Sequence, residues 1–199
     1  MRLFVIMLFA FGSLLMIVTR LTPKVDRIEV SGNEHYSRDE ILALADVKPG
    51  DPFLWVTSWR VAELVRDPWI TRVRITRHWP HTISIVVWER KPVATDGETT
   101  WAQDGTVLPE VDARVRAELV EITGWGLPRI TEALELVPML EPFGLQVISY
   151  TPEGFEIQLP ESSLYTPSIR ALRDHWGAVV SQEGRRVAVY PWGVSRADD

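Results

Sequence analysis

The residues of this sequence that could carry out chemistry are few, and their spacing is unfavourable. His78 and His81 lie three residues apart and flank Trp79-Pro80, a corner between two expected strands. Two histidines can bind one metal ion when a helix presents both rings on the same face, but a hairpin corner offers no such face. The sequence therefore predicts an exposed turn at this point and no metal site.

Nucleophilic and acid–base catalysis also lack a suitable arrangement. Ser162 and Ser163 have no histidine in a recognisable relation, and the Gly-x-Ser-x-Gly pattern is missing. The acidic stretches 118–121 and 132–141 could supply paired carboxylates, but solvated surfaces explain them more simply. There is no glycine-rich phosphate loop and no cysteine, which excludes thiol catalysis and disulfides. We therefore expect a protein that is not an enzyme and binds no cofactor.

Charge is distributed unevenly along the 199 residues, whose net charge is −6. Residues 24–92 carry 11 basic and 10 acidic side chains, whereas residues 93–199 carry 8 basic and 17 acidic ones. Nucleic-acid binding needs clustered lysine and arginine to contact phosphates. The acidic distal half therefore argues against nucleic acid as a partner. The length allows one large domain or two small ones.

The beginning of the chain is apolar. Residues 3–18 are interrupted only by Gly12 and Ser13, which is the short end of the roughly 17–25 residues that cross a bilayer as a helix. A cleavable signal peptide is the alternative, but no small-residue cleavage pattern follows the run. We expect residues 1–23 to form a cytoplasmic stub and a single transmembrane helix. Basic residues on both sides leave its orientation open.

Residues 24–92 have the pattern of a small α+β domain. Residues 25–31 alternate between apolar and polar side chains, as a half-buried strand does. Two helices should follow, one ending near Ala45 and one running from residue 57 or 58 to Arg66. Two strands then surround the Trp-Pro corner and form a hairpin. The order strand, helix, helix, strand, strand requires the first strand to join an edge of that hairpin.

The start of the first helix carries a specific signal. Ser37 and Glu40 have the spacing of a capping box, in which each side chain binds the backbone N–H of the other. Tyr36 precedes the cap and Ile41 follows it at the fourth helical position, the arrangement of a hydrophobic staple. We therefore expect this helix to begin at residue 38.

These stretches resemble the POTRA domain of the FtsQ/DivIB family of bacterial cell-division proteins. Each matching motif is weak alone, but their order and spacing over about 70 residues are specific. The motifs are Val30-Ser31-Gly32-Asn33, Asp67-Pro68-Trp69-Ile70, Trp79-Pro80-His81-Thr82 and Glu89-Arg90-Lys91-Pro92-Val93-Ala94. The apolar run before residue 24 fits the same family.

Residues 93–199 predict a larger distal domain, a mixed β-sheet with flanking helices. Its expected elements are a hairpin with a type I′ turn at Asp104-Gly105, a strand within 119–126, a helix capped by Thr131, a second hairpin around 151–154, a helix capped by Thr166, and a last strand within 185–195. Several of these positions are similar to the family pattern that follows the POTRA domain.

The resemblance implies a non-enzymatic scaffold of the division septum. Such a protein is a single-pass protein of the cytoplasmic (inner) membrane with most of its chain outside, and it links early division proteins to septal cell-wall synthesis. The implied partners are FtsB/DivIC-like and FtsL-like membrane division proteins, other divisome components and the lipid bilayer. The alternative is a POTRA-containing component of protein translocation or outer-membrane assembly, although those proteins usually repeat the domain or append a barrel.

The last expected strand suggests how a partner could bind. A strand at the end of a sheet can leave one edge unpaired, and an extended segment of a partner can add to that edge. The predicted contact residues are Val187, Val189, Tyr190 and Trp192. Inward packing of the two aromatic side chains remains the alternative.

Overall fold

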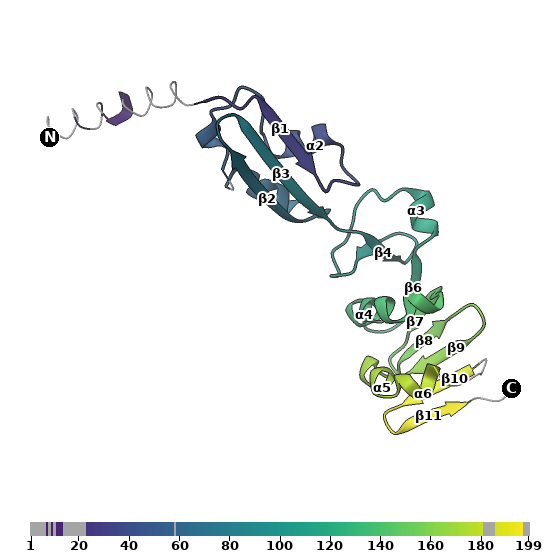
Figure 1. Ribbon diagram of the computed structural model, residues 1–199. Coiled ribbons are helices and arrows are strands. Elements are labelled where there is room, and N and C mark those ends of the chain that lie inside the picture. Colours follow the sequence, from purple (N-terminus) through teal and green to yellow (C-terminus); the bar gives the residue numbers. More distant parts are fainter. Residues whose placement is uncertain are drawn as a thin grey trace. The chain divides into compact units, whose positions relative to one another are not determined.

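The structure, a computed structural model, describes residues 7, 9, 11–13, 23–57, 59–180 and 186–196. The chain folds into two compact units, and the boundary between them lies between Arg90 and Lys91 (Figure 1). The expected transmembrane helix falls mainly on residues outside these ranges. Across the ranges that are described, the structure contains no helix with the length and apolar character needed to span a bilayer.

The first unit is a three-stranded sheet with short helices. Its elements are β1 (Arg27–Ser31), α2 (Arg38–Leu44), the 3-10 helices η1 (Phe53–Trp55) and η2 (Arg60–Arg66), β2 (Ile70–His78) and β3 (Thr82–Glu89). The strand order is β1-β3-β2, with β1 parallel and β2 antiparallel to β3. The predicted hairpin is confirmed, and so is the addition of the first strand to its edge.

The second helix of this unit differs from the prediction. It begins at Arg60 rather than at residue 57 or 58, and it is a 3-10 helix. The N–H of Ala62 donates to the carbonyl of Trp59, three residues earlier, which is the 3-10 pattern. The β-branched Val61 and Val65 lower the helix propensity of so short a stretch. The burial of Val61 and Leu64 therefore holds this segment against the core.

One face of the sheet forms the core of the first unit. Ile83, Ile85 and Val87 are buried, and the residues between them on β3 are only partly buried. This alternation places one set of side chains under the helices and the other on the open face. On the open face the guanidinium of Arg72 lies 4.0 Å from the ring centre of Trp88. Strand β3 therefore has one buried face and one open face.

The capping box of α2 is present. The Ser37 hydroxyl accepts a hydrogen bond from the N–H of Glu40 (3.3 Å), and the Glu40 carboxylate accepts one from the N–H of Ser37 (2.8 Å). Hydrogen bonding of the Glu40 carboxylate to the side chain of Ser37, and then to its backbone N–H, lowers the pKa of Glu40 because it favours the charged form. Ile41 is fully buried and Tyr36 packs against the same core, as a hydrophobic staple requires.

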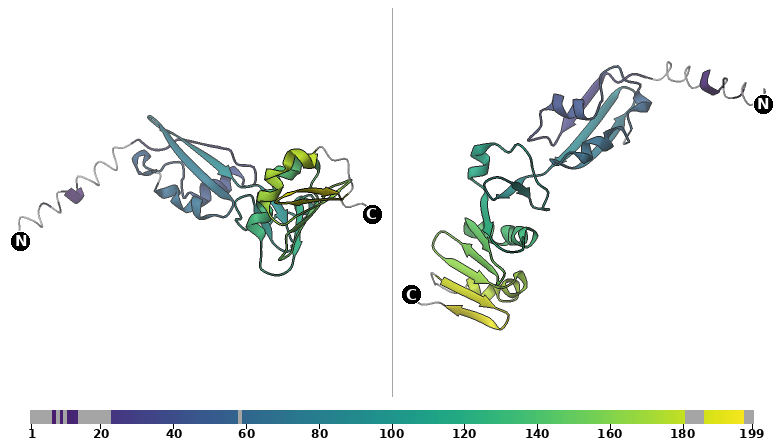
Figure 2. Two further views of the ribbon diagram at one scale, coloured as in Figure 1. Left: turned by 90° about the horizontal axis from the view of Figure 1, so that it is seen from below. Right: turned by 180° about the vertical axis from the view of Figure 1, so that it is seen from behind.

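The second unit contains one eight-stranded mixed sheet. Its strands are β4 (Pro92–Thr95), β5 (Thr100–Ala102), β6 (Val120–Gly124), β7 (Val147–Tyr150), β8 (Phe155–Gln158), β9 (Ser163–Thr166), β10 (Arg186–Tyr190) and β11 (Gly193–Arg196). They lie in the order β11-β10-β9-β8-β7-β6-β4-β5. Its helices are α3 (Ala113–Ala117), α4 (Ile130–Leu140), η3 (Glu141–Phe143), α5 (Ile169–Asp174) and α6 (Trp176–Val180). Figure 2 shows α4 and α5 on the same side of this sheet, where they cover its core.

The turn after β5 is not the type I′ turn that the sequence suggested. Such a turn needs positive φ at both central residues, but only Gly105 has one, at 81°, and Asp104 does not. The N–H of Gly105 donates to the carbonyl of Ala102 (3.0 Å). The Asp104 carboxylate accepts from the N–H of Thr106 (3.1 Å), a local bond that stabilises a longer loop with glycine at the left-handed position.

The predicted caps of two helices, Thr131 and Thr166, are wrong. Helix α4 begins at Ile130, so Thr131 lies inside its first turn. Thr166 ends strand β9, and its hydroxyl donates to the carbonyl of Ser168 (2.8 Å). Ser168 is the cap of α5, because its hydroxyl accepts from the N–H of Ala171 (3.2 Å). A threonine before proline fits a strand end as well as a cap, since both are extended.

We expect replacement of Ser37 by alanine to lower the free energy of unfolding of the first unit by about 0.5–2 kcal/mol. The substitution removes the acceptor for the Glu40 N–H and breaks the reciprocal pair. Urea denaturation followed by circular dichroism measures the effect. Ser31→Ala, an exposed serine on β1, is the matched control. Equal midpoints for the two variants would rule out a contribution from the cap.

Candidate functional site at the sheet edge

The predicted contact residues lie on and just after β10. This strand pairs with β9 on one side and with β11 on the other. Val187 and Val189 are buried in the core of the second unit. The expectation that they lie on an edge strand is therefore wrong, because a further strand, β11, follows and covers that edge.

The sequence contains the signal for this extra strand. Pro191 and Trp192 form the connection between Tyr190 and Gly193, which face each other across the two strands. Proline cannot donate to a sheet ladder, and a glycine after it commonly marks a turn. The prediction of one strand over 185–195 ignored both residues, and so it joined two strands into one.

The two aromatic residues lie at the end of β10, where the chain turns. Val189 points into the core, so Tyr190 points to the opposite face of the sheet. The rings of Tyr190 and Trp192 are stacked, with centres 5.1 Å apart and planes at 6°. Trp192 is 82% exposed. These two residues therefore remain available as contact residues, whereas the buried valines do not.

A third aromatic residue, Tyr165, extends this group and was not predicted. Its ring centre lies 5.9 Å from that of Tyr190, and its hydroxyl donates to the carbonyl of Glu153 (3.2 Å). Tyr165 lies on β9 opposite Ala188 of β10. The sequence reading missed it because it placed no strand at residues 163–166. We call Tyr165, Tyr190 and Trp192 the aromatic row.

Strand β11 is the outermost strand at one end of the sheet within the part of the chain that the structure describes. It is the yellow strand beside β10 in Figure 1. An outermost strand presents alternate backbone N–H and C=O groups to the surroundings, which another extended chain can pair with. The combination of this strand and the aromatic row gives a candidate surface for strand addition.

Two of the motifs that resemble a POTRA domain, those at Asp67–Ile70 and Glu89–Ala94, meet at the end of the first unit's hairpin that lies away from the Trp79-Pro80 corner. The carboxylate of Glu89 accepts hydrogen bonds from three successive backbone N–H groups, those of Glu34 (2.7 Å), His35 (2.5 Å) and Tyr36 (3.2 Å). Bonds from N–H groups to a charged acceptor are stronger than neutral ones. Glu89 thus fixes the loop between β1 and α2 to the end of β3.

Two neighbours reinforce this junction. The Arg90 guanidinium donates to the carbonyls of Pro68 (2.8 Å) and Ile70 (2.9 Å). The ring of His35 stacks on Trp69 with centres 3.6 Å apart. Residues of two motifs therefore act together with residues 34–36 to close the first unit, which explains the residue types of these motifs by structure alone.

The same junction changes the acidity of Tyr36. Its hydroxyl donates to the carboxylate of Asp67 (3.0 Å). Burial, and then this hydrogen bond, raise the pKa of Tyr36 to about 12, because both favour the neutral phenol. Gly32, which directly follows β1, has a φ of 82°, and a Cβ at that position would collide with the carbonyl oxygen of Val87. Only glycine fits there.

The other candidates for chemistry lie apart from this junction. His81 has its Nδ1 atom 2.9 Å from the carbonyl oxygen of Lys24. Ser162 and Ser163 line a largely apolar pocket that Trp176 also borders. Among the described residues, no three histidine, aspartate or glutamate side chains form a group that could hold a metal ion.

Comparisons with known proteins match the first unit and part of the second. Residues 24–90 match the family model of the POTRA domain, FtsQ-type. The chain is 43% identical over 126 residues to the cell division protein FtsQ of Geobacter sp. (strain M21), which covers 62% of this chain and 43% of that protein. It is 34% identical over 112 residues to the cell division protein DivIB of Bacillus subtilis (strain 168), covering 52% and 42%. Each match thus spans less than half of the relative.

We expect replacement of Glu89 by glutamine to destabilise the first unit by about 1–3 kcal/mol. The neutral amide loses the charge that strengthens the three N–H bonds, and its NH₂ group cannot accept them. Urea denaturation measures the change. Glu29→Gln is the control, since within the described part of the chain the Glu29 carboxylate forms an exposed pair with Arg27 at 3.9 Å. A Glu89 variant as stable as this control would disprove the anchoring role.

Proposed function

We propose that the chain is a non-enzymatic scaffold of bacterial cell division, because residues 24–90 match the FtsQ-type POTRA domain and the resemblance to the FtsQ/DivIB family is confirmed. It is a single-pass protein of the cytoplasmic (inner) membrane at the septum, with residues 24–199 outside. Through protein–protein contacts it links early division proteins to septal cell-wall synthesis. The names of its relatives support the division role.

The apolar residues 3–18 support the membrane part of this proposal. Their composition suits the hydrocarbon layer, and the first unit begins only a few residues later. The family resemblance supplies the orientation, because the basic residues on both sides do not decide it. The lipid bilayer is therefore one of the proposed partners.

The observation that carries the binding proposal is the outermost position of β11. We infer that an extended segment of a membrane division protein adds to this strand, with FtsB/DivIC-like and FtsL-like proteins as the partners. Backbone hydrogen bonds supply affinity in strand addition, and side chains supply specificity. Tyr190 and Trp192 supply contacts here, because they lie at the turn that leads into β11.

We expect Tyr190→Ala and Trp192→Ala each to weaken the proposed partner contact by about 2 kcal/mol, roughly a thirty-fold increase in Kd. Each change removes an aromatic side chain while the core residues Val187 and Val189 stay in place. Binding of the purified partner's extracytoplasmic segment by isothermal titration calorimetry measures the effect. Trp125→Ala, another exposed tryptophan of the same unit, is the matched control. Unchanged affinity in both variants would place the partner surface elsewhere.

We expect the full chain, fused to a fluorescent protein that matures outside the cytoplasm, to form a band at mid-cell in dividing bacteria. Protein contacts of the two folded units should concentrate it at the septum. The control carries the same fluorescent protein after residues 1–23 alone, which should label the envelope evenly. Fluorescence microscopy compares the two. An even envelope signal from the full chain would contradict the division role and favour the translocation or assembly alternative.

A further inference from the structure

Three exposed tryptophans belong to the first unit. Trp55 is 53% exposed, Trp59 84% and Trp79 71%. Tryptophan is large and on average highly buried. Trp69 of the same unit is only 5% exposed and Trp88 is half-buried. The exposure of the first three tryptophans therefore needs an explanation that the core of the unit does not provide.

Two of these tryptophans lie where the chain enters the unit. The N–H of Phe53 donates to the carbonyl of Pro23 (2.9 Å), and the N–H of Asp26 donates to the carbonyl of His81 (2.9 Å). The rings of Phe53 and Trp79 meet edge to face, with centres 6.0 Å apart. These bonds join residues 23–26, the segment that contains Trp55, and the hairpin tip that contains Trp79.

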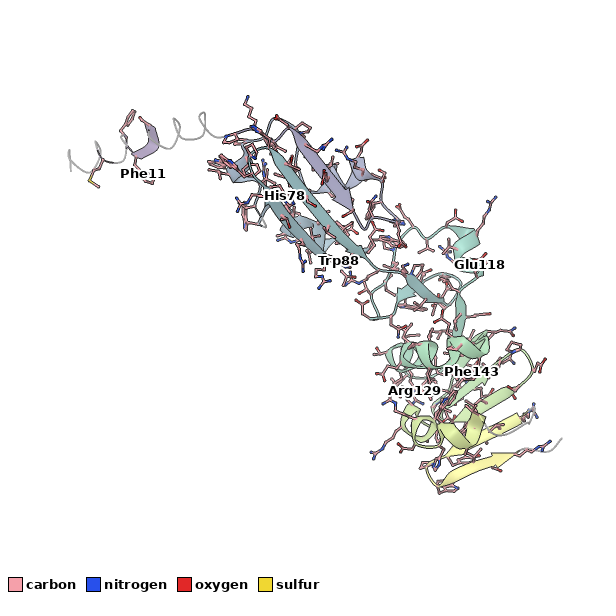
Figure 3. The ribbon with its side chains drawn as sticks, viewed as in Figure 1. Phe11, His78, Trp88, Glu118, Arg129 and Phe143 are labelled. Carbon is pink, nitrogen blue, oxygen red and sulfur yellow. The ribbon has the colours of Figure 1, made fainter. Side chains whose placement is uncertain are left out.

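The third tryptophan belongs to the same end. Its neighbour Arg60 binds the carboxylate of Asp51 (2.9 Å), and the carbonyl of Asp51 accepts from the N–H of Val25 (2.9 Å). Trp59 is therefore held close to the entering chain. Figure 3 shows His78 at this end of the hairpin and Trp88 at the opposite end.

The chemistry of this end fits a phospholipid surface. Tryptophan combines a large apolar ring with an N–H donor, and it is enriched at membrane–water interfaces for that reason. Charge adds only a small preference, because the exposed Lys24, Lys48 and Arg77 are nearly balanced by the exposed Asp26 and Asp46. The apolar rings rather than anionic lipids must therefore supply the affinity.

The entering chain also limits the distance to a bilayer, provided that residues 3–18 occupy its hydrocarbon layer, as the proposed function requires. Pro23 follows Val18 by five residues, which span at most about 18 Å when fully extended. The headgroup layer on each side of a bilayer is about 5–8 Å thick. The tryptophan end of the first unit thus lies within reach of the headgroups.

We propose that Leu54, Trp55, Trp59 and Trp79 form a membrane-seating patch that rests in the phospholipid headgroup layer beside the chain's own anchor. This contact restrains the tilt of the first unit on the membrane. The inference rests on the proposed membrane anchor and adds a second, peripheral contact to it.

A pair of spin labels tests the patch in the full chain, because the sequence contains no cysteine. Leu54→Cys lies in the patch and Val65→Cys lies near the end of η2, toward the opposite end of the hairpin. The two side chains are equally exposed, at 48% and 50%. Each variant is labelled with a nitroxide and reconstituted in phosphatidylcholine vesicles. Electron paramagnetic resonance then measures collisions with a water-soluble nickel chelate.

We expect the chelate to reach the label at position 54 severalfold less often than the label at position 65. Adding Trp55→Ser and Trp59→Ser, which alter exposed side chains only, should make the two positions similar. Circular dichroism confirms that these variants are folded. Equal access at both positions in the unsubstituted background would overturn the patch.

Vesicle flotation separates this inference from the proposed function. If the chain floats with the vesicles but the chelate reaches positions 54 and 65 equally, the membrane anchor is supported and the patch is disproved. If the chain does not float, both the membrane anchor and the patch are disproved, since the patch needs a bilayer within reach of Pro23. Shielding of position 54 that appears only after other membrane proteins are added would assign these tryptophans to a protein partner and overturn the proposal.

Discussion

The first unit depends on one carboxylate that binds three consecutive backbone N–H groups. Glu89 joins residues 34–36 to the end of β3, although these segments are more than fifty residues apart in the sequence. The loop it holds precedes the cap of α2, so the position of that helix depends on the same contact. Arg90 then fixes the start of β2 through two carbonyls. A charged acceptor is well suited to this task, because N–H groups in a loop have no ladder partner.

The elements with strong local signals could be predicted from the sequence. Ser37 and Glu40 define the cap of α2 through atoms only three residues apart, and the alternation of Ile83, Ile85 and Val87 defines a strand. The caps of α4 and α5 could not be predicted. Thr166 has the composition of a cap, but pairing with β8 holds it in a strand, and only the tertiary structure contains that pairing.

In the candidate site, too, the features that depend on tertiary pairing could not be predicted from the sequence. Tyr190 and Trp192 were predicted as contact residues, and the structure places them on the surface beside the outermost strand. Val187 and Val189 were predicted with them, but alternation along a strand does not tell which face is covered. Tyr165 joins the aromatic row only through the parallel pairing of β9 with β10, which no local pattern encodes. The exposure of three tryptophans in the first unit could not be predicted either, because their surroundings come from segments that are distant in the sequence.

The strand order of the second unit has a consequence for how the sheet is built during synthesis. From β7 to β11 each strand lies beside the one that precedes it in the chain, so the ribosome delivers these strands in the order in which they assemble. Each new strand can pair with the strand that was synthesised just before it, and pairing between sequence neighbours favours rapid folding. The sheet can therefore grow in one direction without gaps. A partner strand that added to β11 would occupy the next position in the same sheet, so that the sheet would contain strands of two chains.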